Sequence, residues 1–197
     1  MTTIDDVMKA PISLHGLGFL QIKLGANQRM HIWHPDLPRR SCFEHSQVHD
    51  HRFGFESRIL VGEQTNKIFS FRQIDPLSSA EAVTHHAYRH EGARLPTGGR
   101  PWVLDTSGIL DVVSTEHNRP GSVYHMLPYV FHESAPLRDG RVATVMRKTA
   151  EHEKGARSLC RPHIAPDEHF DRYQLSVAQM WEVVEDVLTQ GYRGEEG

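Results

Sequence analysis

The 197-residue chain contains only two cysteines, Cys42 and Cys160, and no Cys-x-x-Cys pair. Disulfide-stapled secreted domains and zinc ribbons both need more cysteine than this. Residues 1–9 include two aspartates and no apolar run of signal-peptide length, and no segment approaches the length of a membrane span. We therefore expect a cytoplasmic protein that has no membrane partner.

The chain also lacks an excess of basic residues, with 22 lysines and arginines against 25 aspartates and glutamates and a net charge of −3. Proteins that bind nucleic acids usually carry a clear basic excess, so we expect no nucleic-acid partner. Histidine, by contrast, is abundant, with 15 residues. Because histidine is the commonest metal ligand and titrates near neutral pH, this excess indicates metal or proton chemistry.

Most of the chain consists of short segments in which apolar and polar residues alternate, separated by Gly, Pro, Asn and Asp. Such alternation is typical of β-strands that bury one face. We predict strands at residues 19–24, 29–34, 58–61, 67–74, 82–89, 101–104, 109–115, 123–127 and 142–148.

The apolar spacing becomes helical only near the end of the chain, over residues 177–188. Ser176 and Gln179 form a capping-box pattern at its start. This order predicts a single all-β domain: an antiparallel barrel or sandwich within residues 1–150, followed by an irregular connection and a helix packed on the barrel within residues 151–197.

Two histidine-containing segments lie far apart in the sequence, QVHDHRFGFESRILVG at 47–62 and GSVYHMLPYVFH at 121–132. His49 and His51 are two residues apart, so on a strand their side chains point to the same face. His132 follows a glycine turn and a proline in the second segment. Three imidazoles from two distant segments can form a metal site inside a barrel, with Glu56 as an optional fourth ligand, and such a site suits Fe(II), Mn(II), Ni(II), Cu or Zn.

These two segments resemble the motifs of the cupins. The first cupin motif is His-x-His, four spacer residues, Glu and then Gly, and the second is Gly, Pro and then His; the matching residues here are His49, His51, Glu56, Gly62, Gly121, Pro128 and His132. The resemblance implies an antiparallel double-stranded β-helix, the jelly-roll barrel. The run His49-Asp50-His51, followed by RILVG at 58–62, is also similar to the thiol dioxygenases, a cupin branch in which three histidines hold Fe(II) and the glutamate is lost.

The spacing leaves the role of Glu56 open, because the gap from Glu56 to Gly62 is one residue shorter than in the cupin pattern. If the motif is anchored on His51, Glu56 is the fourth ligand. If it is anchored on Gly62, Phe55 takes that position and the site has three histidines. We favour Glu56 as a ligand, because Gly54 can bend the chain and turn the carboxylate inward.

Two further residues are candidate catalytic groups. Arg58 follows Glu56 by two residues and can bind a substrate carboxylate in a bidentate manner. His125, seven residues before His132, can face the pocket as an acid–base group.

The resemblance implies one divalent metal ion, Fe(II) in the first place and Zn, Ni or Mn otherwise, and a small-molecule substrate. It favours a mononuclear Fe(II) dioxygenase similar to the thiol dioxygenases, and it is compatible with a homodimer. The alternative is a redox-neutral or non-catalytic metal-binding cupin, which means an isomerase, a lyase or a protein that binds a small ligand.

Overall fold

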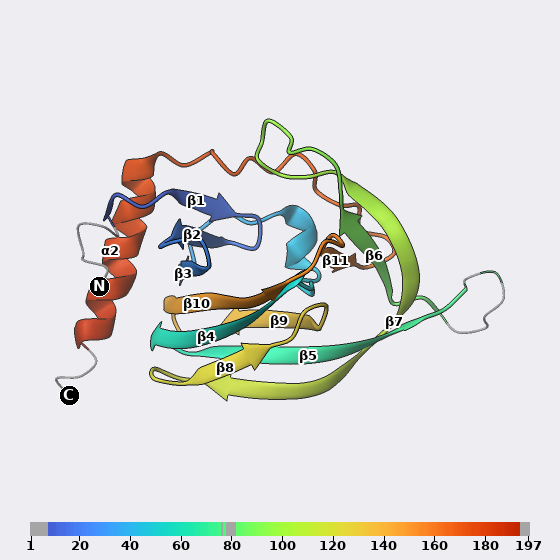
Figure 1. The fold of residues 1–197 in the computed structure, drawn as a ribbon, viewed down its shortest axis with the longest axis horizontal. Coiled ribbons are helices and arrows are strands. Elements are labelled where there is room, and N and C mark those ends of the chain that lie inside the picture. The colour runs from blue at the N-terminus through green and yellow to red at the C-terminus, as the bar shows by residue number, and fades with distance from the viewer. Residues whose placement is uncertain (1–7, 76, 78–81, 194–197) are drawn as a thin grey trace.

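The computed structural model describes residues 8–75, 77 and 82–193, and these residues form two antiparallel β-sheets and one long helix, α2 (Val177–Arg193) (Figure 1). The first sheet has the strand order β1-β2-β3-β10-β4-β8, with bounds β1 Ile12–His15, β2 Phe19–Lys23, β3 Gln28–Trp33, β10 Val142–Glu151, β4 Phe53–Val61 and β8 Val123–Met126. The second has the order β11-β6-β7-β5-β9, with bounds β11 Arg157–Cys160, β6 His85–His90, β7 Trp102–Asn118, β5 Gln64–Gln73 and β9 Phe131–Pro136.

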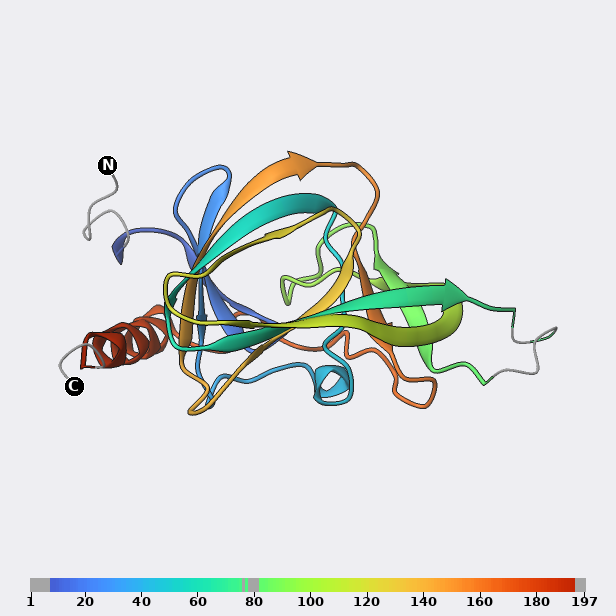
Figure 2. The same cartoon turned by 90° about the horizontal axis from the view of Figure 1, so that it is seen from below.

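The strands curl into a half-barrel, and α2 lies at one end of it (Figure 2). The predicted all-β antiparallel architecture with a C-terminal helix is therefore confirmed. None of the helices in the described part of the chain is long and apolar enough to cross a membrane.

Helix α2 begins with the predicted capping box. The backbone N–H of Ser176 donates to Oε1 of Gln179 at 2.9 Å, and the backbone N–H of Gln179 donates to Oγ of Ser176 at 3.2 Å. These bonds satisfy two amide groups that the first turn of a helix leaves free. The buried side chains of Met180, Val184 and Val187 then pack on the core formed by the first three strands.

The second sheet differs from the prediction in its longest strand. The two strands predicted at 101–104 and 109–115 are one continuous strand, β7, which begins at Trp102; its first half pairs with β6 and its second half pairs with β5. The two partners meet at Gly108, where a Cβ would collide with the carbonyl oxygen of Arg72 and the ring of Phe71. Glycine is needed here for close packing, so it does not mark the end of a strand.

Strand β11 lies inside the segment that the sequence indicated to be irregular. Its four residues pair with β6, from Arg157 opposite Arg89 to Cys160 opposite His86. Four residues are too few to show an alternation of polar and apolar residues, so the sequence did not predict this strand. It is stabilised by its pairing with β6. The second sheet therefore extends past residue 150.

The backbone around His49 joins the two edge strands of the second sheet. The amide of His49 donates to the carbonyl of His132 on β9 at 3.0 Å, and the amide of His132 donates back at 2.9 Å. On the side of β11, the backbone amide of Asp50 donates to the carbonyl oxygen of Arg157, and the backbone amide of Leu159 donates to the carbonyl oxygen of Val48, both at 2.9 Å. The Val48 side chain packs in a small core with Ala87, Phe131 and Leu159. Four backbone hydrogen bonds thus hold this segment between β9 and β11.

The glycine that ends the first histidine motif is a structural requirement, which substitution can test. Gly62 has a φ of +72°, and a Cβ there would collide with the carbonyl oxygen of Arg141. We expect Gly62→Ala to lower the free energy of unfolding by at least about 2 kcal/mol, measured by urea denaturation. Gly25→Ala, at a site with no neighbouring atom within 4 Å, is the matched control and should change stability little. Equal stability of both variants would contradict the assignment.

Candidate metal centre

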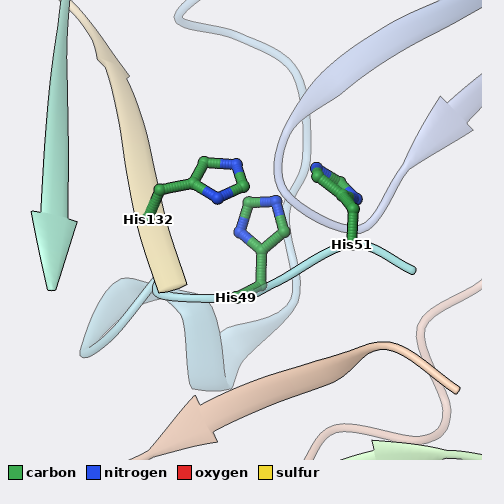
Figure 3. A group of neighbouring side chains, drawn as sticks. All are labelled: His49, His51 and His132. Carbon is green, nitrogen blue, oxygen red and sulfur yellow. The ribbon is translucent and has the colours of Figure 1, made fainter. Parts of the chain in front are cut away.

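Three histidines gather between the two sheets, as the sequence predicted. His49 and His51 lie on the extended segment before β4, and His132 lies on β9 (Figure 3). Their potential ligand atoms all lie within 4.8 Å of one another. Ring centroids are separated by 4.5 Å for His49 and His132, 4.8 Å for His49 and His51, and 5.1 Å for His51 and His132. This arrangement can hold one metal ion.

The backbone of the His49 segment determines where the imidazoles point. Because the chain is extended there, the side chains of His49 and His51 share one side, whereas Val48 and Asp50 take the other. His49 and His132 exchange two backbone hydrogen bonds, so their side chains leave directly opposed positions on paired segments. The carbonyl of His51 accepts a hydrogen bond from the amide of Tyr129 at 2.8 Å. Both histidines of the first motif are thereby attached to the chain that carries the third.

The residue between the two histidines, Asp50, anchors the segment through an ion pair. Its side chain is fully buried and accepts hydrogen bonds from the backbone amide of Arg157 at 2.6 Å and from Nε of Arg157 at 2.8 Å. The same guanidinium lies over the ring of Phe131, 4.5 Å from its centroid. A buried pair with several hydrogen bonds has a well-defined geometry, and this one fixes the position of the His-x-His backbone.

Hydrogen bonds also select the tautomers that metal binding needs. Nδ1 of His49 lies 2.8 Å from the carbonyl oxygen of Gln47, and Nδ1 of His132 lies 3.0 Å from that of Val130. A carbonyl only accepts hydrogen bonds, so both Nδ1 atoms carry the proton. In the neutral imidazole, Nε2 then has a free lone pair, which is the form that a metal ion takes up.

The surroundings keep the three imidazoles neutral. Burial lowers the pKa of His49, and it lowers the pKa of His132 to about 3. Burial, followed by the charges of the other two histidines, lowers the pKa of His51 well below its usual value. At neutral pH all three therefore lack the proton that would compete with a metal ion.

Apolar side chains surround the three rings. Phe55 lies 5.4 Å from the ring of His51 and 5.9 Å from that of His132, measured between centroids. The three imidazoles, Phe55, Ser57 and Tyr124 line an inner cavity of about 50 Å³. A space of this size holds a metal ion with a few small ligands.

The structure does not bring Glu56 to the three histidines, which corrects our expectation of a fourth ligand. The pairing of β4 with β10 shifts register between Gly54 and Phe55, but β4 keeps regular pairing with β8 from Phe55 to Arg58, so the carboxylate is not turned inward. Phe55 and Ser57 face the cavity, and Glu56 lies on the opposite face. There it lies 3.9 Å from His125 and 4.0 Å from Arg147. The alternative anchored on Gly62, a three-histidine site with Phe55 at the glutamate position, fits this geometry.

The two candidate catalytic residues share that outer face. Arg58 is exposed, and the His125 side chain is 69% exposed. Strand pleating explains both positions, because Arg58 is two residues from Glu56 and His125 pairs directly opposite Glu56 on β8. The structure therefore separates Arg58 and His125 from the metal centre.

Two histidines that the motifs did not include lie beside the centre. His15 and His31 line a larger cavity together with His49 and His51. Nε2 of His31 is buried and has no hydrogen-bond partner in the described part of the chain, and burial lowers the pKa of His31 to about 3. The sequence predicted a strand at residues 29–34 but did not single out His31, because only the pairing of the strands shows which face is inside.

No protein-family model matches this chain, and no curated protein is significantly similar to it. Its chemistry is therefore inferred from the residues of the site.

The ligand set can be tested by comparing an inward with an outward side chain. We expect His132→Ala to lower metal affinity by at least about 100-fold, because it removes a ligand, whereas Glu56→Gln leaves the affinity within about twofold. Metal content after dialysis against a buffered metal solution, measured by atomic emission, checks both. A large loss of metal in Glu56→Gln would restore the four-ligand interpretation.

The anchoring role of Asp50 makes a separate prediction. Asp50→Asn keeps the shape of the side chain but removes the closer of the two carboxylates that pair with Arg157, leaving only Asp105 at 3.9 Å, so the free energy of unfolding should fall by about 3 kcal/mol. Because the segment between the two histidines loses its anchor, metal affinity should also fall about tenfold or more.

Denaturation and metal titration of Asp50→Asn measure the two effects. The control is Glu151→Gln, which removes the partner of Arg52 in an exposed pair with an N–O distance of 2.7 Å. It should cost about 1 kcal/mol or less and leave metal affinity unchanged. If Asp50→Asn behaved like this control, the ion pair would have no role in the site.

Proposed function

We propose that the protein is a metal-dependent enzyme with a jelly-roll barrel of the cupin type, in which His49, His51 and His132 hold one divalent ion, Fe(II) in the first place. The proposed reaction is the O₂-dependent oxidation of a small organic molecule, which makes the protein a dioxygenase. The observation that carries the proposal is a centre of three neutral imidazoles from which the candidate carboxylate, Glu56, points away.

The donor set fits an open metal site. Three nitrogen ligands leave up to three positions of an octahedral ion free, and a bound Fe(II) would supply these positions for a substrate and O₂ together. A fourth protein ligand with a negative charge would occupy one position and weaken the attraction for an anionic substrate. The three-histidine set also agrees with the resemblance to the thiol dioxygenases, which supports a thiol as the first substrate class to test.

The protein's own residues control access and protonation. Phe55, Tyr124 and Met146 line the inner cavity and keep bulk water from the ligand positions. The hydroxyl of Tyr124 accepts a hydrogen bond from Nε2 of Gln64 at 3.0 Å, so Tyr124 is held in place. The carbonyls of Gln47 and Val130 hold the protons on Nδ1 of His49 and His132, which orients Nε2 of each toward a common point.

A redox-neutral reaction, such as an isomerisation or an elimination, is the second candidate. One observation favours it: His15 and His31, whose Nε2 has no hydrogen-bond partner among the described residues, line the larger cavity beside the metal ligands. A neutral imidazole at that position can hydrogen-bond to a substrate that a metal ion polarises. A non-catalytic metal-binding cupin that holds a small ligand is the remaining alternative.

Oxygen consumption separates these functions. We expect protein reconstituted anaerobically with Fe(II) to consume O₂ with at least one member of a panel of small thiols and thiol-free carboxylates. His51→Ala should reduce the rate by at least about 100-fold, because it removes a ligand, and Glu56→Gln should retain the rate within about twofold. A Clark-type electrode and mass spectrometry of the product provide the measurement.

The other outcomes identify the alternatives. Substrate conversion by the Zn(II)-loaded protein without O₂ uptake would show the redox-neutral function. Ligand binding without conversion, in either metal form, would show the non-catalytic one.

A further inference from the structure

A second cavity adjoins the metal centre and shares His49 and His51 with it. Its volume is about 350 Å³, and Phe19, His31 and Met146 also line both cavities. A cavity of this size suits a small organic molecule. Its position means that a molecule bound there reaches the open side of the three histidines.

The wall of this larger cavity is strongly basic. Among the described residues that line it are six arginines and one carboxylate, that of Asp50; the arginines are Arg29, Arg40, Arg94, Arg100, Arg157 and Arg172. The chain as a whole carries a net charge of −3, so this concentration of positive charge belongs to the cavity and not to the overall composition. A concave, positively charged wall attracts and retains anions.

Two of these arginines have structural partners. Arg157 pairs with Asp50. Arg40 donates to the carbonyl oxygen of Asp167 and lies over the rings of Trp102 and Phe170, 5.5 and 5.4 Å from their centroids. Both side chains are therefore already held by the fold.

Three others, Arg29, Arg94 and Arg172, contact neutral groups, and the sixth, Arg100, donates to the carbonyl oxygen of Gly92. Nε of Arg172 donates to the carbonyl oxygen of Leu14 at 2.9 Å, a terminal nitrogen of Arg94 donates to that of Gly98 at 2.6 Å, and Arg29 lies 5.5 Å from the centroid of the Phe53 ring. Within residues 8–75, 77 and 82–193, none of the three forms an ion pair. Guanidinium groups held by neutral partners remain able to bind an oxyanion in a bidentate manner.

These three charges also act on one another. Burial, followed by the charge of Arg94, lowers the pKa of Arg172 to about 10, so Arg172 still carries its charge at neutral pH. Burial lowers the pKa of Arg29 as well; the charge of Glu151 opposes this shift, and that of Arg94 adds to it. Bringing like charges together in a half-buried wall destabilises the empty cavity, and an anion with several charges removes that repulsion.

We propose that the larger cavity binds a small molecule with at least two negative charges, on phosphate or carboxylate groups, which Arg29, Arg94 and Arg172 hold while the rest of the molecule reaches His49 and His51. If the proposed function is correct, this molecule is the substrate of the enzyme. The binding of the anion itself does not depend on the proposed function. Phe19, Phe43 and Trp102 line the same cavity and provide an apolar wall for the uncharged part of the molecule.

Calorimetric titration of the full-length, metal-free protein tests the binding itself. The probes are pyrophosphate, tricarballylate and the neutral triamide of tricarballylate, each at low and at high salt. We expect at least one of the two anions to bind, with an affinity that falls at high salt, and the triamide not to bind. Tighter binding of pyrophosphate would identify a phosphorylated substrate, and tighter binding of tricarballylate a polycarboxylate.

Substitutions locate the site. Arg29→Gln/Arg94→Gln should weaken anion binding by at least about tenfold, and Arg94→Gln alone, at an exposed side chain, should produce part of that loss with no risk to folding. Arg119→Gln, an exposed arginine outside both cavities, is the matched control and should bind as the wild type does. Circular dichroism verifies that each variant is folded.

The proposed anion site and the proposed metal-dependent function can be tested independently of each other. His132→Ala should lose the metal but keep anion binding, because His132 lines only the inner cavity. Absence of anion binding by the wild type, equal binding of the triamide, or unchanged binding in both arginine variants would overturn the anion site. Absence of O₂ consumption with intact, arginine-dependent anion binding would overturn only the proposed oxidation.

Discussion

The site depends on the hydrogen-bonded junction that residues 48–50 make between strands β9 and β11. Four backbone hydrogen bonds hold this segment, and the buried pair of Asp50 and Arg157 anchors it from one side. Because β9 carries His132, the junction that brings the two edges of the second sheet together also brings the third imidazole to the first two. The three-histidine cluster is therefore a consequence of how the sheet is closed, and we expect the Asp50 anchor to affect both stability and the affinity of the cluster for a metal ion.

The two adjoining cavities differ in their electrostatics. Around the three histidines, burial among apolar side chains keeps the imidazoles neutral and available to a metal ion. A short distance away, six arginines line a larger space, and among the described residues Arg29, Arg94 and Arg172 form no ion pair. Like charges held close together cost stability in an empty cavity, and such a cost is common where a protein binds a charged ligand. The proposed metal site at one end and the proposed anion site at the other would together orient a charged small molecule toward the three histidines.

Residue patterns were sufficient for the elements that have strong local signals. Alternation identified the long strands, and the capping box of Ser176 and Gln179 located the start of α2. Strands β1, β9 and β11, residues 53–57 of β4 and the continuity of β7 through Gly108 were missed. For β11 and for Gly108 the deciding interaction is pairing with a strand distant in the sequence, which produces no recognisable alternation in four residues or at a single glycine.

The same division holds for the site. The sequence by itself determined that His49 and His51 share one side and that they and His132 are suited to one metal ion, because a two-residue spacing has the same consequence in any extended chain. The roles of Glu56, Arg58 and His125 were decided by tertiary structure, since the regular pairing of β4 with β8 places all three on the outer face. Tertiary structure alone also assembled the arginine wall, because Arg29, Arg94 and Arg172 come from segments that only the folded chain places around one cavity.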